Sequence, residues 1–163
     1  MNKVLITGED LTLDDIVSVC RGNAQVEISQ EAKDKVKASR QVVDDLIAEE
    51  KVVYGITTGF GKFSDVVISQ DQCKELQKNL IITHAVGAGD PFSRDIARGI
   101  MLLRINNLSK GFSGIRLETL QTMADMLNKG VTPIIPEKGS LGASGDLAPL
   151  SHMVLPMIGL GLA

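Results

Sequence analysis

A chain of 163 residues, 44% of them apolar, is long enough to build one hydrophobic core and has the usual size of a single domain. Its 17 basic and 20 acidic residues are mixed along the sequence, so the formal charge is only -3, and no basic stripe exists to follow the backbone of a nucleic acid partner. Cys20 and Cys73 lack the spacing of a metal site, so we expect two reduced, packed thiols and no bound metal.

The first part of the chain predicts two short strands and two helices. Apolar and β-branched residues dominate 4–7 and 26–28, as in strands, and a helix is expected between them over 11–19. Ser29 is a suitable N-cap for a long helix through Glu50 with one apolar stripe. The N-terminal apolar run meets acidic residues by position 9 and is too short for a signal peptide, so we expect a cytoplasmic protein.

A glycine-rich loop and three further helices follow. Residues 53–63 lose the helical period, and their glycines and threonines indicate a tightly turned loop of a kind that often carries function. Ser69 is expected to cap a helix that ends at His84. A helix over 91–110 should be largely buried, and another should cover 115–128. The apolar stripe by which the helix over 91–110 should pack into the core comprises Ile96, Ile100 and Leu103, widened by Ala97, Met101 and Leu108.

The last segment combines a glycine-rich run, residues 139–146 (GSLGASGD), with a strongly apolar one. From 147 to 163 nearly every residue is apolar, but prolines interrupt the run and it is too short to span a bilayer. We expect a core helix that has no polar face and needs partners on all sides. The sequence therefore predicts one mainly α domain over 1–163, with one or two short strands and glycine-rich loops, leading into a truncated helical bundle.

Three interpretations compete for residues 139–146. The first is a flexible turn with Ser144 or Asp146 as N-cap of the next helix, and the second is an anion cradle at the helix N-terminus, which lacks a P-loop lysine. The third is self-modification, in which the Gly145 nitrogen attacks the carbonyl carbon of Ala143 and closes a five-membered ring. Loss of one water from the ring and a second from the Ser144 side chain would leave a methylidene-imidazolone, a strong electrophile.

The run from Gly139 through Leu150 resembles the signature of the aromatic amino acid ammonia-lyase and aminomutase family, whose members form this prosthetic group. Three other blocks are similar to family segments in the same order: residues 54–61 (YGITTGFG) to the tyrosine loop, 84–87 (HAVG) to a substrate-pocket segment, and 104–114 to the next helix and turn. The similarity covers essentially the whole chain. Members of the family are several times longer, which identifies this chain as an N-terminal piece.

The resemblance implies a role for each matching residue. Tyr54 is the base that removes the β-proton, His84 and Gly61 bind the substrate, and Asp146 orients the prosthetic loop. The group itself, 4-methylidene-imidazol-5-one, forms from Ala143, Ser144 and Gly145. Without the resemblance, Tyr54 is a packed tyrosine with a bonded hydroxyl, and His84 is a helix-terminal histidine that interacts with the helix dipole. His152 is interpreted as a core histidine with a satisfied ring nitrogen.

A histidine at position 84 suits a substrate with a polar ring, because a buried polar group left unpaired costs about 1–3 kcal/mol. Histidine or tyrosine is therefore preferred to phenylalanine. Within the family the chain is most similar to the bacterial histidine enzymes, which implies elimination of ammonia from L-histidine to give urocanate. Their sites are assembled from several subunits of a homotetramer, so the isolated chain should have little turnover. The alternatives are a tyrosine ammonia-lyase, an aminomutase, or a catalytically silent helical module that self-associates.

Overall fold

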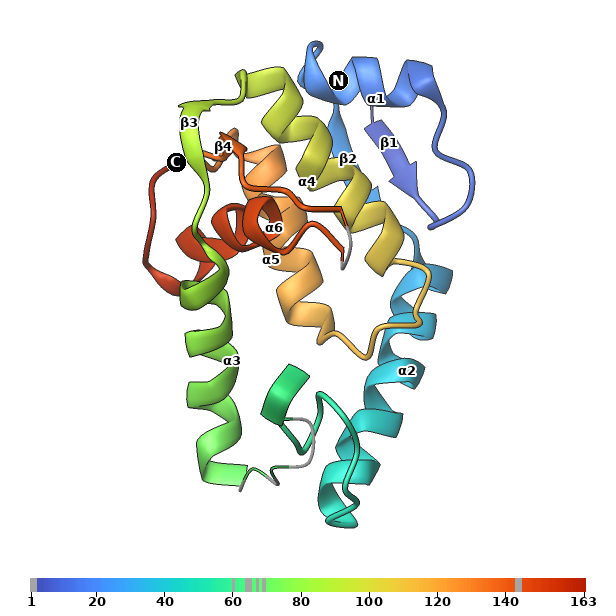
Figure 1. The fold of residues 1–163 in the computed structure, drawn as a ribbon. Helices are drawn as coiled ribbons and strands as arrows, with labels where there is room; N and C mark the ends of the chain where they lie inside the picture. The colour runs from blue at the N-terminus through green and yellow to red at the C-terminus, as the bar shows by residue number, and fades with distance from the viewer. Residues whose placement is uncertain (1–2, 60, 64–65, 67, 69, 143–144) are drawn as a thin grey trace.

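The computed structural model describes residues 3–59, 61–63, 66, 68, 70–142 and 145–163, and within these it is mainly α-helical, as predicted (Figure 1). The helices are α1 (Leu13–Cys20), α2 (Gln30–Ala48), α3 (Gln70–His84), α4 (Arg94–Leu108), α5 (Leu117–Asn128) and α6 (Leu147–Val154), with 3₁₀ turns η1 (Gly61–Phe63) and η2 (Leu155–Ile158). The strands are β1 (Lys3–Ile6), β2 (Gln25–Ile28), β3 (Ala88–Pro91) and β4 (Pro136–Lys138).

The two strands predicted near the N-terminus form a parallel pair, with Lys3 opposite Gln25 and Ile6 opposite Ile28. Helix α1 connects them and begins two residues later than predicted, because Thr12 caps it. The Thr12 side chain accepts a hydrogen bond from the Asp15 N–H at 3.2 Å, and the Asp15 carboxylate accepts one from the Thr12 N–H at 3.1 Å. This reciprocal pair satisfies two amides that the helix cannot bond internally.

The hydrophobic core lies around α4, which packs against α1 and α5, while α5 packs in turn against β2 and α2. The predicted stripe on α4 is partly wrong. Ile96 and Leu103 are about half exposed, at 48% and 52%, because the buried face is rotated by one position along the helix. Its fully buried apolar residues are Ala97, Met101, Leu102 and Ile105. Cys20 is a buried free thiol, as predicted, whereas the Cys73 side chain and Ser69 lie outside what the structure describes.

One charged side chain is completely enclosed in this core. Arg98 is 1% exposed, and its guanidinium donates two hydrogen bonds to the Val19 carbonyl, at 3.2 and 2.9 Å, and one to the Leu127 carbonyl at 2.9 Å. These carbonyls lie in the last turns of α1 and α5, where the helix dipole is negative. Arg98 therefore closes the C-terminal ends of two helices at once.

A second strand pair was not predicted. Strands β3 and β4 run antiparallel, with Ala88 opposite Lys138 and Pro91 opposite Pro136, and an irregularity between these pairs. The segment before α4 was expected only to end the preceding helix, because glycine, aspartate and proline are typical of turns and are depleted in strands. The pair joins the end of α3 to the segment before α6, two regions far apart in the chain (Figure 1).

The expected core helix over 147–163 is much shorter. Helix α6 ends at Val154 and passes into the 3₁₀ turn η2, since Pro156 lacks the N–H that a continued helix would need. Gly159 then adopts a positive φ of 75°, and the last residues are exposed and not helical. Their backbone contacts the segment before β4, where the Ile134 N–H donates to the Leu162 carbonyl at 2.9 Å. None of the described helices is long and apolar enough to cross a membrane.

Candidate functional site

The glycine-rich loop 139–146 connects β4 to α6 and bends sharply on both sides of its centre. Ala143 and Ser144 lie outside the described residues, so their predicted roles stay predictions. Beside them, Gly142 has a φ of 73° and Gly145 a φ of 88°. These left-handed conformations are easy for glycine and costly for residues with a Cβ. The flanking backbone is therefore turned in a way that only small, permissive residues allow.

The two ends of this loop are linked by a side-chain contact, since the Ser140 hydroxyl donates to Oδ1 of Asp146. Asp146 occupies the N-cap position of α6, but its carboxylate makes no capping hydrogen bond, contrary to the expected double role. Its backbone explains this, because φ is 54° whereas capping side chains usually extend from a β-region residue. The Asp146 carboxylate therefore holds the loop rather than the helix.

A small cavity of about 260 Å³ opens beside the same loop. Apolar groups from α4, α6 and the strand segment provide most of its wall, and the Ser140 and Asp146 side chains provide a polar part. The remaining lining residues are Phe92, Ile100, Pro136, Glu137, Pro149 and Leu150. Ser140 and Asp146, near the two ends of the loop, thus line a partly apolar hollow.

The loop after α2 is tightly turned, as predicted, and two buried threonines hold it. The Thr57 hydroxyl donates to the Lys51 carbonyl at 2.6 Å and accepts from the Val53 N–H at 2.8 Å. Thr58, which is 1% exposed, accepts from the Gly55 N–H at 3.2 Å. Side-chain bonds to nearby backbone groups of this kind replace the hydrogen bonds of a regular helix or strand.

Tyr54 lies on the surface of this loop, with 61% of its area exposed. Its hydroxyl oxygen accepts a hydrogen bond from the Gly61 N–H at 3.3 Å. The structure thus brings together two of the predicted site residues, Tyr54 and Gly61, across the turn. A backbone N–H that donates to the phenolic oxygen fixes the position of the ring.

His84 is the last residue of α3 and is half-buried. Its Nδ1 lies 2.8 Å from the Leu80 carbonyl oxygen and 3.3 Å from the Thr83 hydroxyl. Because a carbonyl oxygen only accepts, Nδ1 carries the proton in the contact with Leu80, and Nε2 of the neutral ring is then an acceptor. The predicted helix-terminal position is confirmed, and the ring nitrogen left for a ligand is Nε2.

His152, on α6, has the satisfied ring nitrogen predicted for it, although the ring is half-buried rather than fully enclosed. Its Nε2 accepts a hydrogen bond from the Gly87 N–H at 3.0 Å, which links α6 to the segment that follows His84. Burial lowers the pKa of His152, because the charged imidazolium is less well solvated there. The neutral ring, which can accept at Nε2, is therefore favoured.

The predicted site residues fall into two groups within the chain. The loop that follows α2 and carries Tyr54 lies between the lower ends of α2 and α3, whereas β3 and β4 lie at the opposite end of the molecule (Figure 1). The segment after His84 and the loop 139–146 adjoin these strands and are connected through α6. Within one chain, the segment that follows His84 therefore lies close to the glycine-rich loop, whereas the loop that carries Tyr54 lies apart from both.

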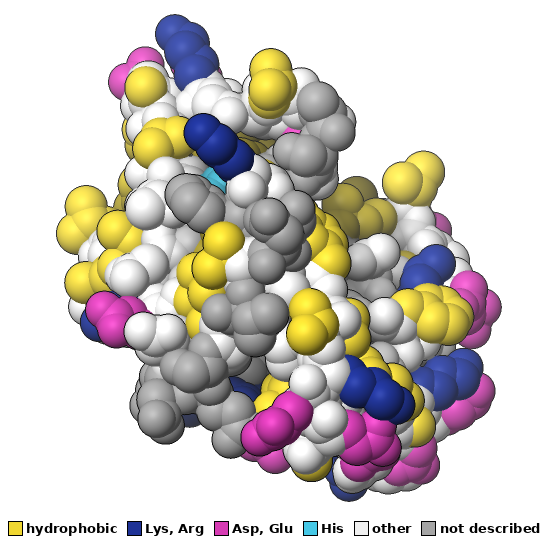
Figure 2. All heavy atoms as spheres, turned by 60° about the horizontal axis from the view of Figure 1, so that its bottom comes forward, with side chains coloured by type: hydrophobic (Ala, Val, Ile, Leu, Met, Phe, Trp, Pro, Cys, Tyr) yellow, Lys and Arg dark blue, Asp and Glu magenta, His cyan; other side chains and the backbone are white. Residues whose placement is uncertain are grey.

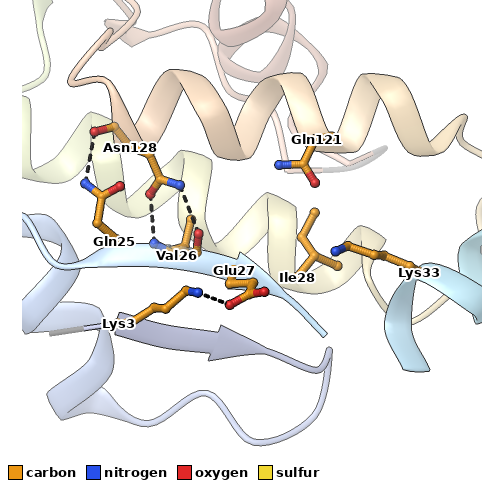
Figure 3. A pocket seen from close by; sticks show the side chains of 8 residues that line it. All are labelled: Lys3, Gln25, Val26, Glu27, Ile28, Lys33, Gln121 and Asn128. Carbon is orange, nitrogen blue, oxygen red and sulfur yellow. Dashed lines mark hydrogen bonds and ion pairs between the residues drawn. The ribbon is translucent and has the colours of Figure 1, made fainter. Parts of the chain in front are cut away.

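The larger pocket, about 390 Å³, lies on the other strand pair and contains none of the predicted site residues (Figure 3). Asn128 accepts from the Val26 N–H at 2.7 Å and donates to the Val26 carbonyl at 2.9 Å, so its amide continues the ladder of β2. Gln25 donates to the Asn128 carbonyl at 3.1 Å, and Lys3 pairs with Glu27. These polar groups fasten β2 to the end of α5, which gives the pocket a structural explanation.

Charge and metal ligands give no further candidate in the described part of the chain. There, no group of three or more histidine, cysteine, aspartate or glutamate side chains is placed to hold a metal ion. On the face shown in Figure 2, the described acidic and basic side chains are interspersed with apolar ones, and no extended patch of one sign is visible. The glycine-rich loop and its surroundings are thus the best-defined candidate site.

The helical fold and the glycine-rich loop before an apolar helix place the chain in a family of lyases. The sequence profile of the aromatic amino acid lyases matches residues 11–163, and the chain belongs to this family. It is 66% identical over 163 residues to the histidine ammonia-lyase of Alkaliphilus oremlandii (strain OhILAs), covering all of this chain and 32% of that protein. The chain thus spans about a third of the length of the curated relatives that it matches.

Solved structures of the same family share the fold. Histidine ammonia-lyase from Trypanosoma cruzi matches with a TM-score of 0.88 and 42% identity over 98% of this chain and 30% of that one. Tyrosine aminomutase from Streptomyces globisporus matches with a TM-score of 0.92 and 39% identity over the same shares of 98% and 30%. The arrangement of helices is therefore common to family members that act on different amino acids.

Proposed function

We propose that the chain is the N-terminal part of an enzyme that eliminates ammonia from L-histidine to give urocanate. The observation that carries the proposal is the 66% identity to a histidine ammonia-lyase along the whole chain, against 39% to a tyrosine aminomutase. In this proposal residues 1–163 form one domain of a cytoplasmic enzyme. Further parts of the substrate pocket would come from the rest of the protein.

The glycine-rich loop fits a methylidene-imidazolone formed from Ala143, Ser144 and Gly145. Gly145 would provide the attacking nitrogen, and among the described residues other than its chain neighbours no atom lies within 4 Å of the position that a Cβ on it would occupy. The Ser140–Asp146 contact holds the loop ends together, which is the orienting role that we assign to Asp146. When formed, the group supplies an electrophile that unmodified side chains lack.

Tyr54 is the proposed base for the β-proton of the substrate. The Gly61 N–H, which donates to the hydroxyl oxygen at 3.3 Å, holds the ring in place for this role. Gly61 contributes through its backbone, and within the described part of the chain no atom beyond its own chain neighbours lies within 4 Å of a Cβ built there. Tyr54 and Gly61 thus act as a pair.

His84 is proposed to bind the ring of the substrate. Its Nδ1–H is committed to the Leu80 carbonyl, so Nε2 can accept a hydrogen bond from an imidazole N–H or a phenol O–H. A phenyl ring offers no such donor and would leave Nε2 unpaired. The arrangement therefore supports histidine or tyrosine as substrate rather than phenylalanine.

Assembly of several chains is part of the proposal. Within one chain the loop after α2, which carries Tyr54, lies at the opposite end of the molecule from the strand pair that precedes the glycine-rich loop (Figure 1). A homotetramer in which one chain supplies Tyr54 and another supplies the loop would bring the proton acceptor and the electrophile together. The 163-residue chain alone is then expected to have little or no turnover.

A tyrosine ammonia-lyase or tyrosine aminomutase is the second candidate. It is favoured by the TM-score of 0.92 with the Streptomyces globisporus aminomutase and by the same polar-ring argument at His84. An aminomutase would return ammonia to the β-carbon, so its product is a β-amino acid rather than a conjugated acid.

The test uses the full-length protein and measures products from histidine, tyrosine and phenylalanine together with the intact mass. We expect urocanate from histidine and a chain lighter by two waters, with both lost in Ser144→Ala. Product from tyrosine alone would overturn the histidine assignment. A chain of unmodified mass with no product would instead support the catalytically silent module.

A further inference from the structure

Two segments of the candidate site meet backbone to backbone at Gly87 and Gly139. A Cβ placed on Gly139 would lie 3.0 Å from the Cα of Gly87, and one on Gly87 would lie 3.1 Å from Pro136 Cβ. Contacts this close leave no room for a side chain at either position without displacing a neighbour. Gly87 ends the segment that carries His84, and Gly139 begins the loop that carries the Ala-Ser-Gly residues.

The strand pair between them sets this approach. In the antiparallel register Ala88 faces Lys138, so Gly87 and Gly139 would be the next opposing residues if the ladder continued. It does not continue, because the Gly87 N–H donates to Nε2 of His152 at 3.0 Å. Gly139 has a φ of 137°, which lies outside the strand region. His152 therefore provides the acceptor for Gly87 at the point where β3 and β4 separate.

Because His152 lies on α6, its hydrogen bond to Gly87 connects the helix after the glycine-rich loop to the segment after His84. Helix α6 starts directly after Asp146, the last residue of the glycine-rich loop, so the His152 ring is fixed to the C-terminal end of that loop. Gly87 adjoins its N-terminal end through Gly139. A Cβ on Gly87 would lie 3.0 Å from Nε2, so the ring also fills the space beside this backbone. One side chain thus contacts the segment of His84 and is anchored to the helix that follows the loop.

We propose that His152 is a positioning residue, which sets the separation between the His84 segment and the glycine-rich loop through the Gly87 N–H. Substrate held by His84 then meets the loop at a fixed distance. The inference rests on the proposed function for the identity of the reaction, but the contact itself does not depend on the substrate. Loss of the Nε2 acceptor should therefore reduce activity even where the protein remains folded.

The experiment compares substitutions in the full-length protein that differ in whether an acceptor can reach Gly87. His152→Gln places Oε1 near the position of Nε2 and retains the acceptor, whereas His152→Met has similar length without one. His152→Asn is polar but too short, since its Oδ1 corresponds to Nδ1. Met153→Leu, a buried swap on the same helix, controls for general disturbance of α6. The readouts are kcat, KM, Tm and the fraction of chains that have lost two waters.

We expect His152→Met and His152→Asn to lose up to about 10²-fold in kcat/KM, the loss that a misplacement of about 1 Å at the reacting groups can cause. The kcat/KM of His152→Gln should stay close to that of the wild type. The Met and Asn variants should melt somewhat lower than Met153→Leu but remain folded at the assay temperature. Equal losses in the Gln and Met variants would overturn the proposal, as would full activity in His152→Met. If both Met and Asn variants fail to fold, His152 serves stability and the proposal is wrong.

The same measurements separate this inference from the proposed function. If the wild type converts tyrosine and not histidine, the histidine assignment fails, and the variants are then compared in the tyrosine reaction. If the wild type converts histidine and the Gln and Met variants do not differ, only the positioning role fails. A wild type that neither loses two waters nor forms product overturns both.

Discussion

The two glycine-rich loops of this chain are stabilised in different ways. The Tyr54 loop is held from inside by Thr57 and Thr58, whose buried hydroxyls bond to its own backbone. The loop 139–146 is held from outside, by the strands at one end, by α6 at the other and by Ser140 bonded to Asp146. The first arrangement suits a residue that must be presented in one orientation. In the second arrangement the contacts are made at the two ends of the loop, which suits the ring formation proposed for its central residues.

The largest effect that separates the two loops is expected from Tyr54→Phe in the full-length enzyme. Loss of a general base lowers kcat by about 10²–10⁴-fold, whereas ring formation depends on the other loop and should continue. Intact mass should still show the loss of two waters, and Tm should hardly change because Tyr54 is 61% exposed. Activity within tenfold of the wild type would show that another group takes the β-proton.

The next effect is on stability and concerns how the Tyr54 loop is held. Thr58→Val keeps the shape but removes the acceptor of the Gly55 N–H inside a site that is 1% exposed. An unpaired buried donor costs about 1–3 kcal/mol, measured as the free energy of unfolding in denaturant. Ser140→Ala is the matched change in the other loop, where both partners are exposed, and it should cost clearly less. The reverse order would contradict the comparison.

A smaller effect on stability is expected at two glycines that have similar left-handed backbone conformations but different proposed roles. Gly142 and Gly145 have φ of 73° and 88°, and no described atom beyond their chain neighbours lies within 4 Å of a Cβ built on either. Alanine at either position should therefore cost only the backbone strain of about 1–2 kcal/mol. Gly145→Ala should also reduce the fraction of chains that lose two waters, because Gly145 provides the ring nitrogen in our proposal. Equal ring formation in both variants would contradict that role.

Much of the fold was predictable because its signals are local. Ser29 caps α2 by accepting from the Ala32 N–H at 3.1 Å, as its position before an amphipathic run indicates. The Tyr54 loop was predictable for the same reason, since its threonines bond within a few residues. The rotation of the buried face on α4 was not, because neighbouring apolar positions compete and tertiary packing decides between them.

The features that sequence reasoning missed depend on residues far apart in the chain. Arg98 bonds to the Val19 carbonyl 79 positions away, and His152 accepts from Gly87 at a separation of 65 positions. The local sequence around an arginine on a helix, or around a histidine in an apolar run, does not predict which distant residue it will contact. The strands β3 and β4 are stabilised by their pairing rather than by composition. The motif residues were therefore identifiable, and the contacts that hold them in place were not.

The smallest expected effect follows from the titration of His152. Burial lowers its pKa in the folded protein below the ordinary value of 6.5, so the unfolded chain takes up the proton first as the pH falls. The stability from the neutral ring is complete above the unfolded pKa and is lost as the pH falls through the folded pKa. Protonation at Nε2 also turns an acceptor into a donor that opposes the Gly87 N–H. Acid should therefore weaken the contact between α6 and the Gly87 segment, next to the loop 139–146, more than the contacts within the Tyr54 loop.

Hydrogen exchange at two amides measures this difference within one protein. The Gly87 amide bonds to a ring that titrates, whereas the Gly55 amide bonds to the Thr58 hydroxyl, which does not. Between about pH 7 and about pH 5, protection corrected for intrinsic exchange should fall at Gly87 and stay constant at Gly55. In His152→Gln the dependence at Gly87 should disappear, because an amide acceptor takes up no proton in this range. A parallel fall at both amides would mean that acid weakens the whole fold and that His152 has no separate part in it.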